Sequence, residues 1–161
     1  MREKDKLKKT LVQDGEAKDE LDQVTIDLAR VTRVMAGGKR MRFRAAVAVG
    51  DHNGRVGFAV AKGADVSIAI NKAARLAKKY AVNIYIVNTT IPHSVEKKFK
   101  AASILLKPAP RGRGIKAGGV MRSILEISGI ENITGKMLGS SNKINNACAT
   151  IEALRMLKAP K

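Results

Sequence analysis

The chain has 161 residues, enough for one medium domain or two small ones that share an interface. Hydrophobic residues make up 45% of the sequence but aromatic residues only 3%, so the core must be built from aliphatic side chains. A formal net charge of +17 makes a compact chain repel itself, which predicts a polyanionic partner. Nucleic acid is the first candidate for that partner and an anionic membrane surface is the second.

The location of the chain follows from what the sequence lacks. The single cysteine, Cys148, excludes an internal disulfide and fits a reducing compartment. No apolar run approaches the ~18 residues of a membrane span, and the N-terminal residues lack the apolar stretch of a secretory signal. We therefore expect a cytoplasmic protein without a membrane partner.

The two signs of charge are separated along the chain. Eight of the fourteen acidic residues lie in the first 27 positions, whereas 25 Lys and Arg face six acids from residue 28 onward. Ordinary soluble surfaces usually intersperse the two signs. This separation favours a binding surface for a polyanion over a merely solvated surface.

The first half of the chain predicts three strands and a helix. Residues 1–22 mix both charges without a sustained period and predict a flexible arm. Strands are expected over 24–36 and 40–49, joined by a glycine turn, and a third strand is marked by Val56, Phe58 and Val60. A helix should start at an Asp65 cap and run to about Tyr80.

The second half predicts a further α/β unit. Apolar runs at 82–87 and 102–107 indicate strands joined by a basic link. A helix should begin near Lys116 and stop at Gly129, a strand should cover 130–138, and Ser140 to Asn142 should cap a last helix. With a boundary near residue 81, the chain divides into an arm at 1–22, a domain at 23–81 and a domain at 82–161.

The strongest functional signal is a basic hairpin. Its two strands surround the Gly37-Gly38 turn and carry six cations, which are Arg30, Arg33, Lys39, Arg40, Arg42 and Arg44. In the second strand the arginines alternate with Met41, Phe43 and Ala45, which predicts a half-buried strand with a solvated basic face. Such a finger can enter a groove or junction of folded RNA. Phe43 can either stack on a base or pack in the core, and its place on the apolar face favours the core.

A glycine-rich loop at 112–119 leaves two alternatives open. Its glycines do not match the spacing of a dinucleotide-binding fingerprint, and Gly135-Lys136 is followed by Met137 where a P-loop needs Ser or Thr. The loop can hold RNA phosphates through its amides and its cations, or it can pack closely against another protein.

Catalysis receives little support. His52 and His93 lie in turn-like contexts without an obvious carboxylate or thiol partner, and the sequence has no zinc-site spacing. Cys148 lies on a predicted buried helical stripe, as an inert core residue would. We expect neither an enzyme nor a cofactor or metal.

Four motifs together resemble the family of bacterial ribosomal small-subunit protein five. They lie at 31–43, at 49–58, at 114–119 with Arg122, and at 139–142 followed by Asn145. The resemblance runs in unbroken order from about residue 24 to 157. The chain differs from the family in having Arg113 where members commonly have Thr, and many members carry a C-terminal tail beyond the position of Lys161.

The resemblance implies an α+β fold of two small domains. The first would be a β-β-β-α unit like a double-stranded-RNA-binding domain, and the second an α/β sandwich also found in some kinases, topoisomerases and ribonucleases. It implies a structural constituent of the small ribosomal subunit that supports assembly and decoding accuracy. The implied partners are small-subunit ribosomal RNA and neighbours of the S-four and S-eight families, with the messenger RNA entry path nearby.

The residues and the resemblance together predict two sets of site residues. The predicted RNA-binding residues are Arg30, Arg33, Gly37, Gly38, Lys39, Arg40, Arg42, Arg44, Arg55, Lys97, Lys98, Arg111, Arg113 and Lys116. The predicted protein-interface residues are Gly114, Gly118, Gly119 and Arg122, facing a neighbour of the S-four type.

Two other functions compete with the ribosomal one. A free regulator or assembly factor that binds double-stranded RNA is disfavoured because the cations extend through both halves of the chain. A small-molecule kinase is disfavoured because the chain lacks a catalytic carboxylate and a phosphate-binding Lys-Ser or Lys-Thr pair near the glycine loop.

Overall fold

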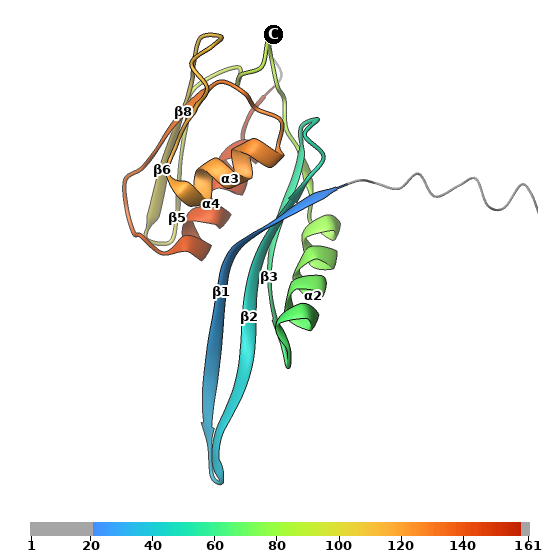
Figure 1. Ribbon diagram of the computed structural model, residues 1–161. Helices are drawn as coiled ribbons and strands as arrows, with labels where there is room; N and C mark the ends of the chain where they lie inside the picture. Colours follow the sequence, from blue (N-terminus) through green and yellow to red (C-terminus); the bar gives the residue numbers. More distant parts are fainter. Residues whose placement is uncertain (1–20, 159–161) are drawn as a thin grey trace, which may run out of the picture.

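The computed structural model describes residues 21–158 and shows two four-stranded sheets. The first sheet is antiparallel in the order β1-β2-β3-β4. Its elements are β1 (Asp22–Met35), β2 (Gly38–Gly50), β3 (Arg55–Gly63), α2 (Val66–Lys79) and β4 (Val82–Asn83). The helix α2 packs against one face of this sheet, chiefly on β3 and β2 (Figure 1).

The second sheet has the order β5-β6-β8-β7, with β7 parallel to β8 and the other pairs antiparallel. Its unit consists of β5 (Val95–Phe99), β6 (Ala102–Pro108), β7 (Ile115–Lys116), α3 (Gly119–Ile127), β8 (Ile133–Met137) and α4 (Lys143–Arg155). Both helices lie on the same side of this sheet, between it and the first sheet (Figure 1). The opposite face of the second sheet is therefore not covered by any described helix or strand.

Two hydrophobic clusters hold these layers together. The smaller cluster lies under α2 and is built largely of alanines, such as Ala69, Ala73 and Ala77, which let the helix approach the sheet closely. The larger cluster joins the two units, because Ala48 and Val56 of the first sheet pack with residues of α3, α4 and the second sheet. The two units thus share one continuous core.

Several sequence predictions are confirmed. The hairpin, the third strand and the first helix form within a few residues of the expected bounds. Asn142 caps α4, where its Oδ1 accepts a hydrogen bond of 3.0 Å from the Ile144 amide. Gly129 follows α3 with a φ of 84°, as expected for a glycine after the end of a helix.

Other predictions about the second half are wrong. The strand expected over 82–87 is reduced to Val82–Asn83, which pairs with β3 in the first sheet. The segment that was expected to be a basic link is the strand β5. The hydrophobic pattern did not predict this strand because its three central residues, Glu96, Lys97 and Lys98, are charged. The helix α3 begins at Gly119, three residues later than expected, because Ile115–Lys116 forms the short strand β7.

The bounds predicted for the domains and the arm are not settled by these strands. The arm predicted at 1–22 lies almost entirely outside the described residues, and Asp22 already belongs to β1. The domain boundary near residue 81 stays a prediction.

The buried surface of two elements also differs from expectation. On α4 the buried positions include Asn146 and Thr150, whereas Cys148 is only half-buried. On β2 every residue from Ala45 to Gly50 is buried, so both faces of this part of the strand are covered. The prediction of a half-buried strand is wrong there because the second unit covers the face that α2 leaves open.

Candidate nucleic-acid interface

The β1–β2 hairpin projects beyond the rest of the protein (Figure 1). Its strands are paired along their whole length, from Asp22 opposite Gly50 to Met35 opposite Gly38. Gly38 has a φ of 133°, a conformation that L side chains rarely adopt, so the tight turn at the tip depends on this glycine. Residues 38–42 are exposed on both faces of the ladder, which leaves the distal part free for a partner.

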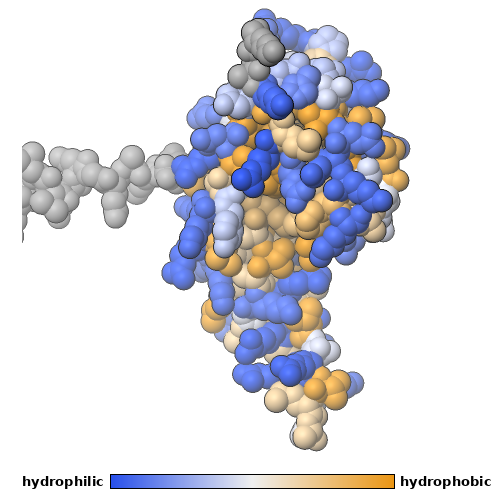
Figure 2. Space-filling view, turned by 180° about the vertical axis from the view of Figure 1, so that it is seen from behind, coloured by the Kyte–Doolittle hydropathy of each residue, from blue (hydrophilic) through white to orange (hydrophobic). Residues whose placement is uncertain are grey.

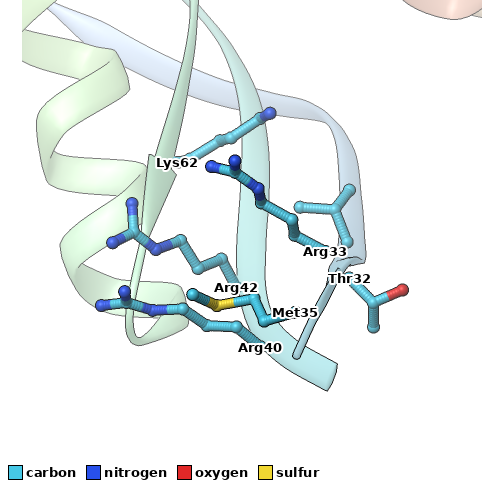
Figure 3. A pocket seen from close by; sticks show the side chains of 7 residues that line it. Thr32, Arg33, Met35, Arg40, Arg42 and Lys62 are labelled. Atoms are coloured by element: carbon cyan, nitrogen blue, oxygen red, sulfur yellow. The ribbon is translucent and has the colours of Figure 1, made fainter. Parts of the chain in front are cut away.

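One face of the distal hairpin gathers four cations. Arg33 of β1, Arg40 and Arg42 of β2 and Lys62 of β3 line a groove of about 280 Å³, together with Val31 and Met35 (Figure 3). We call these four residues the cationic face. In the β1–β2 register Arg33 lies directly opposite Arg40, and like charges at such a position destabilise a sheet. A bound anion would remove this repulsion.

The other face of the hairpin carries Arg30 and Lys39 among apolar residues. Arg30 pairs with Phe43, whose half-buried ring packs against the cluster under α2, so the core alternative for Phe43 is confirmed. Val34 is 73% exposed and Met41 51% exposed, although Met41 was predicted on a buried face. Figure 2 accordingly shows hydrophobic residues at the lower end of the hairpin beside hydrophilic ones.

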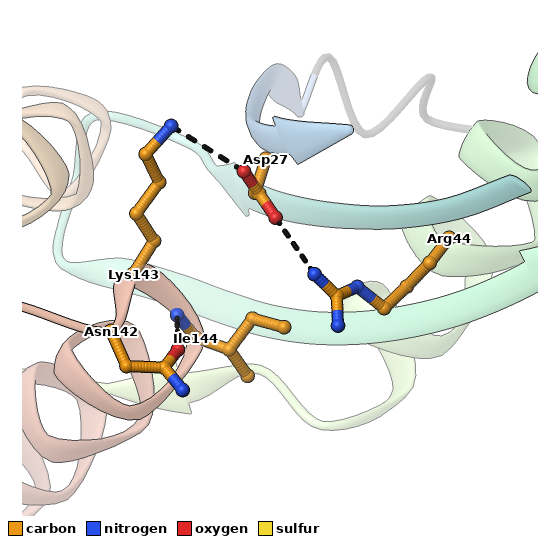
Figure 4. Close-up of polar contacts among 5 residues, drawn as sticks. All are labelled: Asp27, Arg44, Asn142, Lys143 and Ile144. Atoms are coloured by element: carbon orange, nitrogen blue, oxygen red, sulfur yellow. Dashed lines mark hydrogen bonds and ion pairs between the residues drawn. The ribbon is translucent and has the colours of Figure 1, made fainter. Parts of the chain in front are cut away.

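Arg44 differs from the other hairpin arginines because an acid of the chain binds it. Its Nη2 lies 3.1 Å from Oδ2 of Asp27, and the other carboxylate oxygen of Asp27 lies 3.4 Å from Nζ of Lys143 in α4 (Figure 4). The prediction of Arg44 as a solvated cation is therefore wrong. Asp27 instead joins Arg44 within the hairpin to Lys143 of the second unit.

The two lysines of β5 point to opposite sides of the second sheet. Lys97 shares its side with Ile104, towards the helices, and its Nζ lies 3.7 Å from Oε2 of Glu152 in α4. Lys98 is exposed on the other side. Arg55 is half-buried at the start of β3, opposite Asn83. Of these three predicted RNA-binding residues, only Lys98 has an exposed side chain on an uncovered face.

The glycine loop between β6 and β7 presents its cations to solvent. Arg111, Arg113 and Lys116 are all exposed. Gly112 and Gly114 have φ values of 82° and 72°, and the Gly114 amide donates to Oδ1 of Asn132 at 3.1 Å. The loop is thus shaped by positive φ angles and held at one end by a side chain of the neighbouring turn.

Three of the four predicted protein-interface residues lie at the beginning of α3, whereas Gly114 lies in the glycine loop before β7. Gly118 precedes the helix, Gly119 opens it, and Arg122 lies one turn further on, with its Nε 2.7 Å from Oε1 of Glu126. A Cβ at Gly118 would meet the terminal methyl group of Met137, so a side chain at this position requires the flexible end of Met137 to move. Arg122 is exposed, with 59% of its side chain accessible, and remains available to a partner.

His52 has the partners that sequence analysis did not find. Its Nε2 lies 2.9 Å from Oδ2 of Asp22, and its Nδ1 lies 3.0 Å from the carbonyl oxygen of Glu126. The His52 amide also donates to the Ile127 carbonyl at 3.1 Å. The turn motif from Asp51 to Gly54 could have indicated this contact. The backbone amides of a tight turn need hydrogen-bond acceptors, which a neighbouring segment must provide.

Within residues 21–158, no group of three or more His, Cys, Asp or Glu could hold a metal ion, and no helix is long and apolar enough to cross a membrane. Burial, and next the charge of Glu152, raise the pKa of the Cys148 thiol, while Lys100 acts in the opposite direction. A raised pKa leaves less of the reactive thiolate at neutral pH.

Two α+β units with a shared core and a projecting basic hairpin are typical of a protein that binds nucleic acid. Comparison with protein families makes this specific. Residues 21–85 match the model of the ribosomal protein S5 N-terminal domain, and residues 97–161 match that of the ribosomal protein S5 C-terminal domain. The chain belongs to the ribosomal protein S5 family, and it therefore has a structural role in the small ribosomal subunit and in translation.

Proposed function

We propose that this protein binds small-subunit ribosomal RNA through the cationic face of its hairpin and through its basic loops. The observation that carries the proposal is the convergence of Arg33, Arg40, Arg42 and Lys62 on one groove. None of the four makes an ion pair with a described acid, in contrast to Arg44. Phosphates of folded RNA are the anions that a projecting finger of this kind can reach.

The second part of the proposal concerns protein neighbours. We infer that Gly114, Gly118, Gly119 and Arg122 face a neighbour of the S-four family, and that a member of the S-eight family lies nearby. The exposed beginning of α3 supports this assignment, because Arg122 is accessible there and Val120 is only partly covered. Such an interface would let the protein influence decoding accuracy beside the messenger RNA entry path, and support assembly of the subunit in the cytoplasm.

The proposal is tested by the salt dependence of RNA binding. If about six phosphates are neutralised, the log–log slope of affinity against salt should be about −4 to −5, at ~0.7–0.9 per phosphate. The double variant Arg40→Gln with Arg42→Gln should reduce the slope by about 1.5 and weaken binding at every salt concentration. The measurement is titration of the full chain with a small-subunit RNA fragment.

A matched control keeps the charge change the same. Lys72→Gln with Lys79→Gln removes two exposed cations from α2 instead of the hairpin. A wild-type slope near zero would contradict phosphate binding altogether. Equal losses in the two double variants would mean that net charge matters and the hairpin does not. Failure of the tagged chain to co-sediment with small subunits after a high-salt wash would favour the free RNA-binding regulator.

A further inference from the structure

The segment that links the two units, between β4 and β5, contains a strained tight turn. Val87 and Thr90 form an isolated antiparallel bridge, in which the amide of each residue donates to the carbonyl oxygen of the other at 2.9 and 3.0 Å. The two residues between them, Asn88 and Thr89, have φ values of 47° and 69°. A β-branched residue such as threonine rarely adopts this conformation, because it costs free energy that the surrounding structure must offset. The contacts of Thr89 therefore show what the turn is built to hold.

Thr89 binds the residues that directly precede β8. Its carbonyl oxygen accepts hydrogen bonds from the amides of Glu131 and Asn132, at 3.1 and 3.0 Å. Its hydroxyl oxygen accepts a third hydrogen bond, of 2.8 Å, from Nδ2 of Asn132. Asn132 is only 4% exposed, so its side-chain amide is shielded from water and depends on partners within the protein. These three hydrogen bonds fix the Asn132 side chain against the linker turn.

The oxygen of the same Asn132 amide holds the glycine loop between β6 and β7. Oδ1 accepts a hydrogen bond of 3.1 Å from the Gly114 amide, and the Gly114 carbonyl oxygen accepts one of 3.3 Å from the Ile133 amide. Because only an oxygen can accept from the Gly114 amide, this contact also requires Nδ2 to face Thr89. The C-terminal end of the loop is thus attached to the linker turn through Asn132.

The N-terminal end of the loop is attached to the next residue of the turn. The Ala109 amide donates to Oγ1 of Thr90 at 3.2 Å, and Ala109 is buried. Two adjacent hydroxyl groups therefore anchor both ends of the loop, Thr90 directly and Thr89 through Asn132. Residues 110–113 lie between the two anchors and are exposed.

The linker does not need these hydroxyl groups in order to stay in place. Ile84 and Ile91, on either side of the turn, are both buried in the larger hydrophobic cluster. The hydroxyls of Thr89 and Thr90 add polar contacts that lead to the loop. Removing only the hydroxyls should therefore leave the linker packed and release the loop.

We propose that Thr89, Thr90 and Asn132 are positioning residues that preset the glycine loop for its protein neighbour. The inference rests on the proposed function, in which Gly114 and the beginning of α3 face a protein of the S-four family. A loop that needs a positive φ at Gly112 and Gly114 has many accessible conformations when nothing holds it. Fixing the loop before binding removes an ordering cost that would otherwise weaken the complex. The linker turn thus strengthens docking of the neighbour through the loop.

The test is the double variant Thr89→Val with Thr90→Val, compared with Thr89→Ser with Thr90→Ser. Valine keeps the β-branched shape, and hence the strain at position 89, but lacks the hydroxyl, whereas serine keeps the hydroxyl. In the full chain, the Ala109 and Gly114 amides should exchange with solvent about fivefold faster or more in the valine variant, roughly the factor that one hydrogen bond supplies. The serine variant should exchange at the wild-type rate. Unchanged exchange in a folded valine variant overturns the proposal.

Two further variants guard this measurement. If the double valine variant does not fold, Thr90→Val alone removes the anchor of Ala109 and gives the same comparison at that amide. Asn142→Ala removes the side chain that caps α4, and should lower stability without changing exchange at Gly114. Equal acceleration in the cap variant and the valine variant would mean that overall stability controls the loop, and the proposal would be wrong.

The functional readout is decoding accuracy, measured with a misreading reporter in cells whose small subunits carry each variant. The valine variant should change misreading in the same direction as Arg122→Leu, because both weaken one interface, and the serine variant should not change it. If Arg122→Leu changes accuracy and the valine variant does not, the positioning role is refuted and the proposed interface stands. If neither changes accuracy, the proposed interface fails, and the inference fails with it.

Discussion

The distal and proximal halves of the β1–β2 hairpin belong to the same two strands but lie in opposite environments. In the distal half, Arg40 and Arg42 are exposed and line the groove. In the proximal half, Ala46 and Ala48 are completely buried at positions that continue the arginine face. The same side of one strand is therefore a charged surface at one end and part of the core at the other.

This difference shows that alternation specifies which side chains share a face but not what covers that face. The arginine side of β2 is covered by the second unit only from Ala46 onward. Small residues replace the arginines where α3 and α4 approach, since alanine leaves room for close packing without a buried charge. The transition occurs at Arg44, which is half-buried and paired with Asp27.

The largest expected effect comes from placing the same charged residue in each half. Ala48→Arg should destabilise the protein by about 3 kcal/mol or more, because it buries an unpaired charge and overfills the shared core. Met41→Arg should change the free energy of unfolding by less than about 0.5 kcal/mol, because that side chain is exposed. Urea unfolding of the two variants measures both values. Similar stabilities would mean that the second unit does not cover the proximal half.

A smaller effect is expected where the two halves meet. Arg44→Gln should cost about 1–2 kcal/mol of stability, since it leaves the poorly exposed Asp27 with only Lys143 as a charged partner. Arg42→Gln, two residues further out on the same face, should cost less than about 0.5 kcal/mol but should weaken RNA binding. Urea unfolding and RNA titration of both variants give the comparison. If Arg42→Gln proves the more destabilising of the two, the transition at Arg44 has been misplaced.

The smallest effect on stability is expected at α3, which covers the proximal half. Arg122→Leu removes an exposed ion pair with Glu126 worth about 0.3–0.5 kcal/mol, and should leave the affinity of the isolated chain for RNA nearly intact. It should instead change decoding accuracy in assembled subunits, because a weaker interface shifts a conformational equilibrium. A misreading reporter in cells, run beside RNA titration, measures both. Lost RNA affinity with normal accuracy would make Arg122 a phosphate ligand.

The sequence predicted the elements whose patterns are local. The glycine turn of the hairpin, the helix α2 and the Asn142 cap depend on residues within a few positions of one another. The strand β5 was missed because its two apolar ends, Val95 and Phe99, enclose charged residues, and its stability comes from pairing with β6. The assignment of Val82–Asn83 to the first sheet was missed because it depends on pairing with β3, more than twenty residues away.

The residues of the candidate site were also predicted where they follow from a local pattern, and were missed where they depend on pairing between distant strands. The exposed cations Arg33, Arg40 and Arg42 were found because the hairpin register follows from its turn. Lys62, which completes the groove, comes from a strand that the hairpin pattern does not contain. The difference between Lys97 and Lys98 became visible only when β5 was recognised as a strand, since alternation then sends adjacent lysines to opposite faces.

The turn between β2 and β3 has a consequence for how the protein is made. The amides of His52 and Gly54 donate to the carbonyls of Ile127 and Ser128, at 3.1 and 3.0 Å, and so satisfy groups that the end of α3 leaves without partners. The ribosome synthesises the donors more than seventy residues before the acceptors. These two hydrogen bonds can form only after residues 127 and 128 have been synthesised. A nascent chain that ends before residue 127 therefore carries the turn without these two acceptors, and the end of α3 adds a backbone link between the two units.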